Sequence, residues 1–287
     1  MPFREQVRAL IELKWPEKQL QIPVPRGWKR VGHVAILNTP ALAIELEEIL
    51  GQAVLLHLSQ VGIETVAVRT APTSDTFRKP DIRIISGKKN TETIHREHGI
   101  KFKLDAARIT FSAGNLHERK RMIEIIREGV LVDMFAAVGN LSLPVVAQRL
   151  PNLKALGIEL NPLAYHYLSQ TIEINGLTNH YQAILGDCRV ETPQNIADYV
   201  IMGCWGADNE HLGAAINALR QDLGGLIFIH TAEPRNQRSF TKKRVEQVLE
   251  KVASPLKIDN YAERKVKWIS PSHVHKVADV LLRNPSI

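Results

Sequence analysis

The sequence predicts an α/β protein in which a doubly wound, mainly parallel sheet follows a smaller α+β amino-terminal domain. Three observations predict this fold class. From residue 114 onward, apolar strand-like runs alternate with helical segments, as in a parallel sheet that is buried on both faces. Before that point, short runs alternate apolar and polar residues, as in a half-exposed sheet. A chain of 287 residues leaves room for about two domains, and we expect them at residues 1–105 and 106–287.

The amino-terminal domain is expected to begin with a helix, because apolar residues recur at helical spacing over residues 1–15. The run VGHVAILN (31–38) predicts a strand, and a helix is expected to follow from Pro40 to about Leu50. Further strands are expected at 64–70 and in three short runs between 82 and 112.

The carboxyl-terminal domain alternates predicted helices and strands. Helices are expected at 114–127, 142–150 and 162–175, the last ending at the cap pair Asn175-Gly176. Strands of the large sheet are expected at 130–136, 155–160, 181–187, 197–203 and 224–231. Segment 257–283 predicts two more strands, which we expect to form an antiparallel pair at the sheet edge.

Composition excludes several classes of protein. Two cysteines cannot build a disulfide framework or a cysteine-rich zinc site, and no histidine pair has metal-ligand spacing, so no metal is expected. No apolar run is long enough to span a membrane, and the first fifteen residues lack the apolar core of a signal peptide, so a cytoplasmic protein is expected. The formal charge of +7 attracts polyanions such as nucleic acid; the alternative is ordinary solubility charge.

Chemically useful residues follow the predicted strands of the large sheet, where the ligands of a doubly wound sheet lie. A carboxylate at Glu159 can accept both hydroxyl groups of an unmodified ribose, and Asp187 suits the amino group of an adenine. The alternative is that these acids are solvated strand ends or helix caps. The candidates in chain order are Asp133, Gly139, Glu159, Asp187 and Cys188.

The loop after the first of these strands contains the single glycine Gly139, with no GxGxxG motif and no P-loop lysine. It therefore need not cradle a pyrophosphate. A nucleoside without phosphates fits better, and S-adenosylmethionine is the common one.

A second group of residues lies upstream, at the start of the helix that leads into the first strand of the large sheet. Ser112, Glu118 and Arg119 can be no more than a helix cap and first-turn charges. Alternatively, the start of this helix faces the same pocket. An arginine there can then pair with the methionine carboxylate, and Glu118 can act as a base, unless it only pairs with Arg121 or Lys120.

Four segments of the carboxyl-terminal domain resemble the tRNA guanine-37 modification superfamily: ITFSAGNLHERKRM, VDMFAAVGNLSLP, GIELNPLAYHYLSQTIEINGL and ILGDCR. This superfamily holds the guanine-37 N1-methyltransferases and the wybutosine-pathway aminocarboxypropyl transferases, with a class I, Rossmann-like methyltransferase domain. The likeness covers about 90–285, and IPVPRGWKRVGHVAILN is similar to the superfamily's amino-terminal region.

The resemblance implies that the chain binds S-adenosylmethionine and tRNA. It makes Arg96, within His95-Arg96-Glu97-His98-Gly99, a candidate substrate-positioning residue. The cofactor residues that it implies are Ser112, Arg119, Glu159, Asp187 and Cys188.

Two departures from the superfamily pattern stand out. After the fourth strand of the large sheet the methyltransferases carry an Asn-Leu-Pro or Asn-Pro-Pro turn, whose asparagine holds the ring nitrogen that is methylated. Here the turn is Met202-Gly-Cys-Trp-Gly206, which resembles the aminocarboxypropyl transferases instead. The second departure is Ala137, where the superfamily often has glycine, and its extra methyl group can press on the cofactor.

The activity that the resemblance implies is transfer of the 3-amino-3-carboxypropyl group to C7 of 4-demethylwyosine at position 37 of tRNA(Phe), with release of methylthioadenosine. A sulfonium activates all three attached carbons, so orientation decides which group is transferred. One alternative is a tRNA guanine-37 N1-methyltransferase. Another is a non-catalytic protein that binds S-adenosylmethionine and RNA. No protein partner is implied.

The amino-terminal domain, 1–105, is expected to bind the tRNA. Arg26, Lys29 and Arg30 can contact phosphates without selecting a sequence. Trp28 and, in the other domain, Trp205 can stack on a base of the anticodon loop. The alternative for each tryptophan is packing within its own domain.

Overall fold

The computed structural model describes residues 2–74, 76–112, 115–235 and 239–286, without the side chains of 72–74. The chain forms two compact units, Met1–Asn115 and Leu116–Ile287. The division falls after residue 115 rather than after 105, because the residues that follow the last strand of the first unit pack onto that unit. The ring of Phe111 contacts those of Phe102 and His95, with centroids 5.3 and 4.7 Å away.

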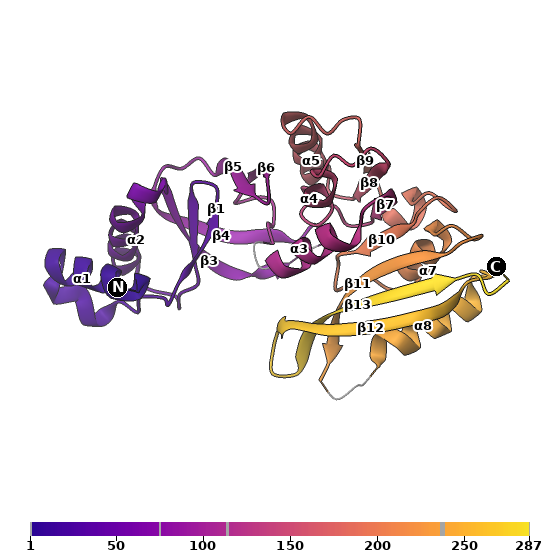
Figure 1. Ribbon diagram of the computed structural model, residues 1–287. Coiled ribbons are helices and arrows are strands. Elements are labelled where there is room, and N and C mark those ends of the chain that lie inside the picture. Colours follow the sequence, from indigo (N-terminus) through magenta and orange to yellow (C-terminus); the bar gives the residue numbers. More distant parts are fainter. Residues whose placement is uncertain (1, 75, 113–114, 236–238, 287) are drawn as a thin grey trace. The chain divides into compact units, whose positions relative to one another are not determined.

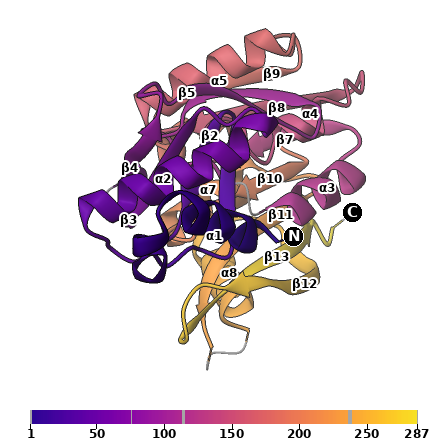
Figure 2. The ribbon, with the colours of Figure 1, turned by 90° about the vertical axis from the view of Figure 1, so that its left-hand side faces the viewer.

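The first unit has a four-stranded sheet in the order β1-β2-β3-β4 and a separate hairpin, β5-β6. Helix α1 packs on α2, and α2 packs on β3 and β4 (Figure 1, Figure 2). The elements are α1 (Phe3–Lys14), a 3-10 helix (Pro16–Gln21), β1 (Trp28–Val31), β2 (Val34–Leu37), α2 (Ile44–Leu58), a second 3-10 helix (Ser59–Val61), β3 (Thr65–Ser74), β4 (Lys79–Gly87), β5 (Glu92–Glu97) and β6 (Ile100–Asp105).

Two expectations for the first unit are wrong. The run 31–38 is not one strand, because Gly32 takes φ +58° and turns the chain into the antiparallel pair β1-β2. Helix α2 begins at Ile44 rather than at Pro40, since Ala43 is still extended and Glu45 and Glu47 supply the acidic first turn that favours a helix start. The first helix, by contrast, is confirmed, with Val7 and Ile11 in the core.

The second unit is built on a seven-stranded sheet in the order β12-β13-β11-β10-β7-β8-β9 (Figure 1). Strands β9, β8, β7, β10 and β11 are parallel, and β13 and β12 form an antiparallel pair at the edge. The strands are β7 (Gly129–Asp133), β8 (Leu153–Glu159), β9 (Tyr181–Leu185), β10 (Tyr199–Met202), β11 (Gly225–Pro234), β12 (Lys257–Trp268) and β13 (His273–Arg283). This topology confirms the predicted fold class and the predicted edge pair.

The helices of the second unit pack on one another in two groups. Helix α3 packs on α4, and α7 packs on both α6 and α8. The helices are α3 (Leu116–Ile125), α4 (Leu143–Val146), α5 (Pro162–Ile174), α6 (Cys188–Glu191), α7 (Asn209–Ala218) and α8 (Phe240–Lys251). The helix expected at 142–150 is only four residues long, because the chain turns at Arg149, which has φ +53°. Within the described residues, no helix is long and apolar enough to cross a membrane.

The order of the strands places a switch point between β7 and β10. From β7 the chain proceeds outward to β8 and β9, and it then returns to lay β10 and β11 on the other side. The carboxyl ends of β7 and β10 therefore flank the position where ligands bind in doubly wound sheets.

Candidate active site at the carboxyl edge of the large sheet

Asp133, at the end of β7, is a buried acceptor that organises the loop after it. Its carboxylate accepts the Phe135 N–H at 3.2 Å and the Ser142 hydroxyl at 2.7 Å, and the Ser142 Oγ lies 2.8 Å from the Tyr181 hydroxyl. Burial raises the pKa of Asp133 to about 6, against the lowering effect of these hydrogen bonds. The structure thus shows how Asp133 shapes the β7 loop, while a direct contact with the cofactor remains a prediction.

Glu159, at the end of β8, ties that loop to the next one. Its carboxylate accepts the Ala137 N–H and the Asn161 N–H, each at 2.7 Å. Burial raises its pKa, and the backbone donors act in the opposite direction. Each carboxylate oxygen keeps a further lone pair, so Glu159 can still accept two hydroxyl groups of a ribose.

The β7 loop needs left-handed backbone at two places. Gly139 has φ +83°, and a Cβ there would lie 2.2 Å from the Leu143 Cδ1 atom, so glycine is required. Ala137 has φ +49°, a left-handed conformation that glycine adopts freely, so glycine suits this position. For alanine this conformation costs about 1 to 2 kcal/mol of strain. Beside them, the buried Asn140 Oδ1 has no hydrogen-bond partner among the described residues.

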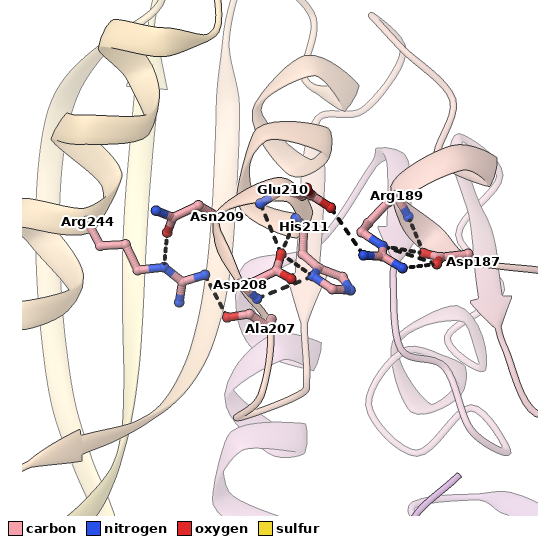
Figure 3. Close-up of polar contacts among 8 residues, drawn as sticks. All are labelled: Asp187, Arg189, Ala207, Asp208, Asn209, Glu210, His211 and Arg244. Carbon is pink, nitrogen blue, oxygen red and sulfur yellow. Dashed lines mark hydrogen bonds and ion pairs between the residues drawn. The ribbon is translucent and has the colours of Figure 1, made fainter. Parts of the chain in front are cut away.

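Asp187 follows β9, next to Glu159. The Gly186 N–H donates to the backbone oxygen of Glu159 at 3.0 Å, so the two strand ends meet. The Asp187 carboxylate accepts the backbone N–H of Arg189 at 2.9 Å and pairs with its guanidinium at 2.5 Å (Figure 3). This guanidinium lowers the pKa of Asp187 to about 2, so the carboxylate stays charged as an acceptor.

A chain of polar contacts leads from Asp187 to α7 and α8. Arg189 also pairs with Glu210 at 3.1 Å, and Arg244 donates to the Asn209 Oδ1 atom at 2.7 Å and the Ala207 oxygen at 2.6 Å (Figure 3). These contacts fasten the ends of α6, α7 and α8 beside the edge of the sheet.

Three potential metal ligands, from Asp187, Cys188 and His211, lie within 4.8 Å of one another. Arg189 already holds the Asp187 carboxylate, and the His211 Nδ1 atom lies 2.6 Å from the Asp208 carboxylate. Burial raises the pKa of the Cys188 thiol to about 12, so it is not a thiolate at neutral pH. These partners fit a protein contact network, and we assign no metal to it.

Glu118 lies in a four-membered ion network. Its carboxylate pairs with Arg121 and Arg264 at 2.9 Å each, and both arginines also pair with Asp279. Burial alone would raise the pKa of Glu118, but the two guanidinium groups bring it below its usual value. This geometry is the structural alternative considered for Glu118, in which it fastens α3 to the β12-β13 hairpin. Arg119, next to it, is wholly buried.

Several of the predicted site residues lie in the first unit. Ser112 is half-buried, and Arg96 is exposed on β5. Arg26, Lys29 and Arg30 are exposed around β1, and Arg30 donates to the backbone oxygens of Gly32 and Val61. Trp28 packs against the apolar core of the unit, which is the alternative considered for it.

Trp205, in the turn after β10, lies above a buried histidine pair that sequence analysis did not select. Its ring lies 5.0 Å from that of His275, and the His275 Nε2 atom lies 3.1 Å from the His230 Nδ1 atom. Burial lowers the pKa of His230 to about 3 and that of His275 to about 4, so both rings are neutral. In the sequence they are marked only by lying in two strand-like runs, LIFIHT with one histidine and HVHKVADV with two.

The polar groups at the strand ends suit a nucleoside. Glu159 offers free lone pairs, Asp187 offers a charged acceptor, and Asn140 offers a buried amide oxygen. A family model described as the TRM5/TYW2 methyltransferase domain matches residues 93–260, and one described as the TYW2 N-terminal domain matches residues 7–91. The chain belongs to the TRM5/TYW2 family.

Individual members of the family match most of the chain. A tRNA(Phe) (4-demethylwyosine(37)-C(7)) aminocarboxypropyltransferase of Methanocaldococcus jannaschii is 35% identical over 257 residues, 88% of this chain and 96% of that protein. The protein of the same name from Pyrococcus horikoshii is 30% identical and covers 97% of this chain and 96% of its own length. The crystal structure of P. horikoshii TYW2 in complex with MeSAdo has a TM-score of 0.80 and 25% identity, and the match covers 98% of this chain and 99% of that chain. The resemblance inferred from the motifs is thereby confirmed.

Proposed function

We propose that this chain transfers the 3-amino-3-carboxypropyl group of S-adenosylmethionine to C7 of 4-demethylwyosine at position 37 of tRNA(Phe). A carbon–carbon bond forms at C7 and a carbon–sulfur bond breaks. Neutral methylthioadenosine leaves with the electron pair of the broken bond, and the C7 proton is released. Such an enzyme works where tRNA is modified, and the cytoplasm is the compartment that we propose.

The observation that carries the proposal within the family is the turn after β10. Met202 ends the strand, and the next residues are Gly203, Cys204 and Trp205. A methyltransferase that alkylates a ring nitrogen needs a polar group to hold that nitrogen, and this turn offers an indole ring instead. An electron-rich carbon nucleophile needs a flat apolar contact more than it needs an amide, and Trp205 can supply this contact. The two archaeal relatives with the named aminocarboxypropyl activity support the same choice.

The residues at the strand ends have distinct roles in this proposal. Glu159 accepts hydrogen bonds from the ribose hydroxyl groups, and Asp187 accepts one from the adenine amino group. Cys188 contacts the adenine ring with its neutral thiol. Ser112 and Arg119 are assigned to the methionine part. When bound, the sulfonium supplies three carbons that are activated toward nucleophiles. The chain's contribution is to fix which of these carbons faces the acceptor.

Glu118 suits positioning better than proton removal. A carboxylate held by two guanidinium groups, with a lowered pKa, is a weak base at neutral pH. We therefore propose that Glu118 holds α3, and with it Arg119, in place. Arg96 in the first unit is assigned to positioning of the RNA, and Arg26, Trp28, Lys29 and Arg30 are assigned to contacts with the tRNA.

The direct test is to incubate the purified protein with S-adenosylmethionine and tRNA(Phe) that carries 4-demethylwyosine. Methylthioadenosine and a nucleoside enlarged by an aminocarboxypropyl group are expected by mass spectrometry. S-adenosylhomocysteine with a one-methyl increment would instead identify a methyltransferase. Binding of both substrates without any product would identify a non-catalytic protein.

A further inference from the structure

The tip of the β12-β13 hairpin projects past the carboxyl edge of the large sheet. Strand β10 ends at Met202, which is level with Ile229 of β11, whereas β11 continues to Pro234, which pairs with His273 of β13. Five more residues of β11 at ~3.3 Å each carry the hairpin about 17 Å beyond the end of β10. The long hairpin is drawn in yellow in Figure 1.

The tip carries apolar surface that the described residues leave exposed. Trp268, the last residue of β12, is 52% exposed, and Ile269 after it is 38% exposed. A tryptophan half open to water on a hairpin tip offers a large ring face for stacking.

Cations flank this indole. The Lys265 Nζ atom lies 4.8 Å from the centroid of the Trp268 ring, and the Arg235 guanidinium carbon lies 5.4 Å from it. Both distances are in the range of cation–π contacts. Nearby Lys276 differs, because Glu233 and Glu263 neutralise it at 2.8 and 2.6 Å.

A β-bulge distributes the lysines of β12 between two tryptophans. Lys265 pairs with Lys276 across the hairpin and Lys267 pairs with His275, so Val266 is the extra residue. Because paired residues share a face of the sheet, the bulge puts Lys265 on the face of Trp268 and Lys267 on the face of His275. The Lys267 Nζ atom accordingly lies 5.8 Å from the centroid of the Trp205 ring. Without the bulge, both lysines would share one face.

The three cations Arg235, Lys265 and Lys267 have no carboxylate partner among the described residues. Positive charge beside stacking rings is the combination that binds single-stranded nucleic acid, since phosphates pair with the cations and bases stack on the rings. We propose that this tip, formed by Arg235, Lys265, Lys267 and Trp268, is a second RNA contact that grips the anticodon loop of the substrate from the catalytic unit itself. This inference rests on the proposed function for the identity of the RNA.

The experiment measures tRNA affinity, by a binding assay over a range of salt concentrations, for the full chain and its variants. Trp268→Ala is expected to weaken binding by about 10-fold with an unchanged salt slope, because one stacked base is lost. Trp268→Phe should retain most of the affinity. Replacing Arg235 and Lys265 together with alanine should weaken binding and reduce the salt slope by about 2, that is, by ~1 for each phosphate contact.

The matched control replaces Lys251, the last residue of α8, and Lys257, the first residue of β12, with alanine. Both are exposed and lie at the opposite edge of the sheet, so this variant loses the same charge and should keep a nearly wild-type affinity. Calorimetry with S-adenosylmethionine should be unchanged in every hairpin variant, which separates a local effect from unfolding. Unaltered tRNA affinity in Trp268→Ala would overturn the proposal. So would loss of binding to phosphatidylserine vesicles with no loss of tRNA binding, which would indicate a lipid surface instead.

Failure of this proposal and failure of the proposed function give different results. If the wild-type protein forms the aminocarboxypropyl product while Trp268→Ala leaves both tRNA affinity and KM for tRNA unchanged, only the hairpin proposal fails. If Trp268→Ala weakens tRNA binding but no wild-type product forms, only the proposed function fails.

Discussion

Two halves of the carboxyl edge are built differently. The nucleoside half, formed by the ends of β7, β8 and β9, places its chemistry within two residues of each strand end, at Asp133, Glu159 and Asp187. The other half is named the acceptor half, after the RNA base proposed to accept the transferred group. It lies where β10 and β11 end and β13 begins, and it brings together Trp205, His230 and His275 from three separate segments. The nucleoside half holds carboxylates that accept backbone N–H groups, whereas the acceptor half holds neutral rings, of which the two histidines are buried. This contrast suits a polar nucleoside on one side and a flat, electron-rich base on the other.

The largest expected effect tests the nucleoside half. Glu159→Ala removes the carboxylate that accepts the Ala137 and Asn161 N–H groups and that we propose as the acceptor of the ribose hydroxyl groups. We expect S-adenosylmethionine affinity to fall by about 100-fold or more, as for two charge-assisted hydrogen bonds. Calorimetry measures this loss, and Glu246→Gln on the exposed face of α8 is the charge-matched control. Wild-type affinity in Glu159→Ala would refute the pocket assignment.

A second prediction tests the neutral rings of the acceptor half. The folded state holds His230 neutral, with its pKa lowered to about 3, while the unfolded chain protonates it below its usual 6.5. The unfolded state then binds more protons, so this histidine makes stability fall as pH falls from 6.5. Between pH 7 and 5 the contribution is about 2 kcal/mol.

Urea unfolding of the wild type and His230→Leu at pH 7 and pH 5 measures this contribution as a difference. The difference is needed because Asp133, with its raised pKa, contributes with the opposite sign over the same range. His275, Arg121 and Arg264 act to keep His230 neutral, and Glu118 opposes them. Parallel pH profiles for the two proteins would show that His230 is protonated in the folded state.

The smallest expected effect concerns the loop that joins the halves. Ala137→Gly should raise the free energy of unfolding by about 1 kcal/mol, because glycine relieves the left-handed backbone at the cost of some unfolded-state entropy. Gly139→Ala should act in the opposite direction, by about 2 kcal/mol, since its Cβ would overlap the Leu143 side chain. Thermal denaturation compares them. A destabilised Ala137→Gly variant would mean that the alanine methyl group packs favourably in the loop.

The contrast also explains what the sequence could predict. Parallel strands are apolar and continuous, so their ends, and the acids after them, can be located from the hydrophobic pattern alone. The pairing of His230 with His275 depends on the antiparallel register of β11 and β13, and the position of Lys267 depends on a bulge at Val266. Neither register nor bulge has a local signal in this chain. Glu118 illustrates the same limit, because its partner Arg264, and Asp279 that shares this partner, are more than 140 residues away in the sequence.

The distribution of charge is another property that the sequence shows only in part. Residues 1–115 hold 17 Lys and Arg against 12 Asp and Glu, and residues 116–287 hold 20 against 18. The second unit is therefore nearly balanced in sum, and only the structure shows that its cations gather without acidic partners at the hairpin tip. The net charge thus predicts an RNA-binding surface on the first unit alone, while the local arrangement of cations predicts one on each unit.

The central claim is that the acceptor half presents a carbon nucleophile to the aminocarboxypropyl group. The most direct measurement is mass spectrometry of the tRNA nucleosides and of the small-molecule product after reaction with S-adenosylmethionine labelled in its carboxyl carbon. The account predicts that the label moves into the nucleoside at position 37 while methylthioadenosine is released without it. Label that stays in released S-adenosylhomocysteine, with a methylated guanosine in the tRNA, would contradict the account.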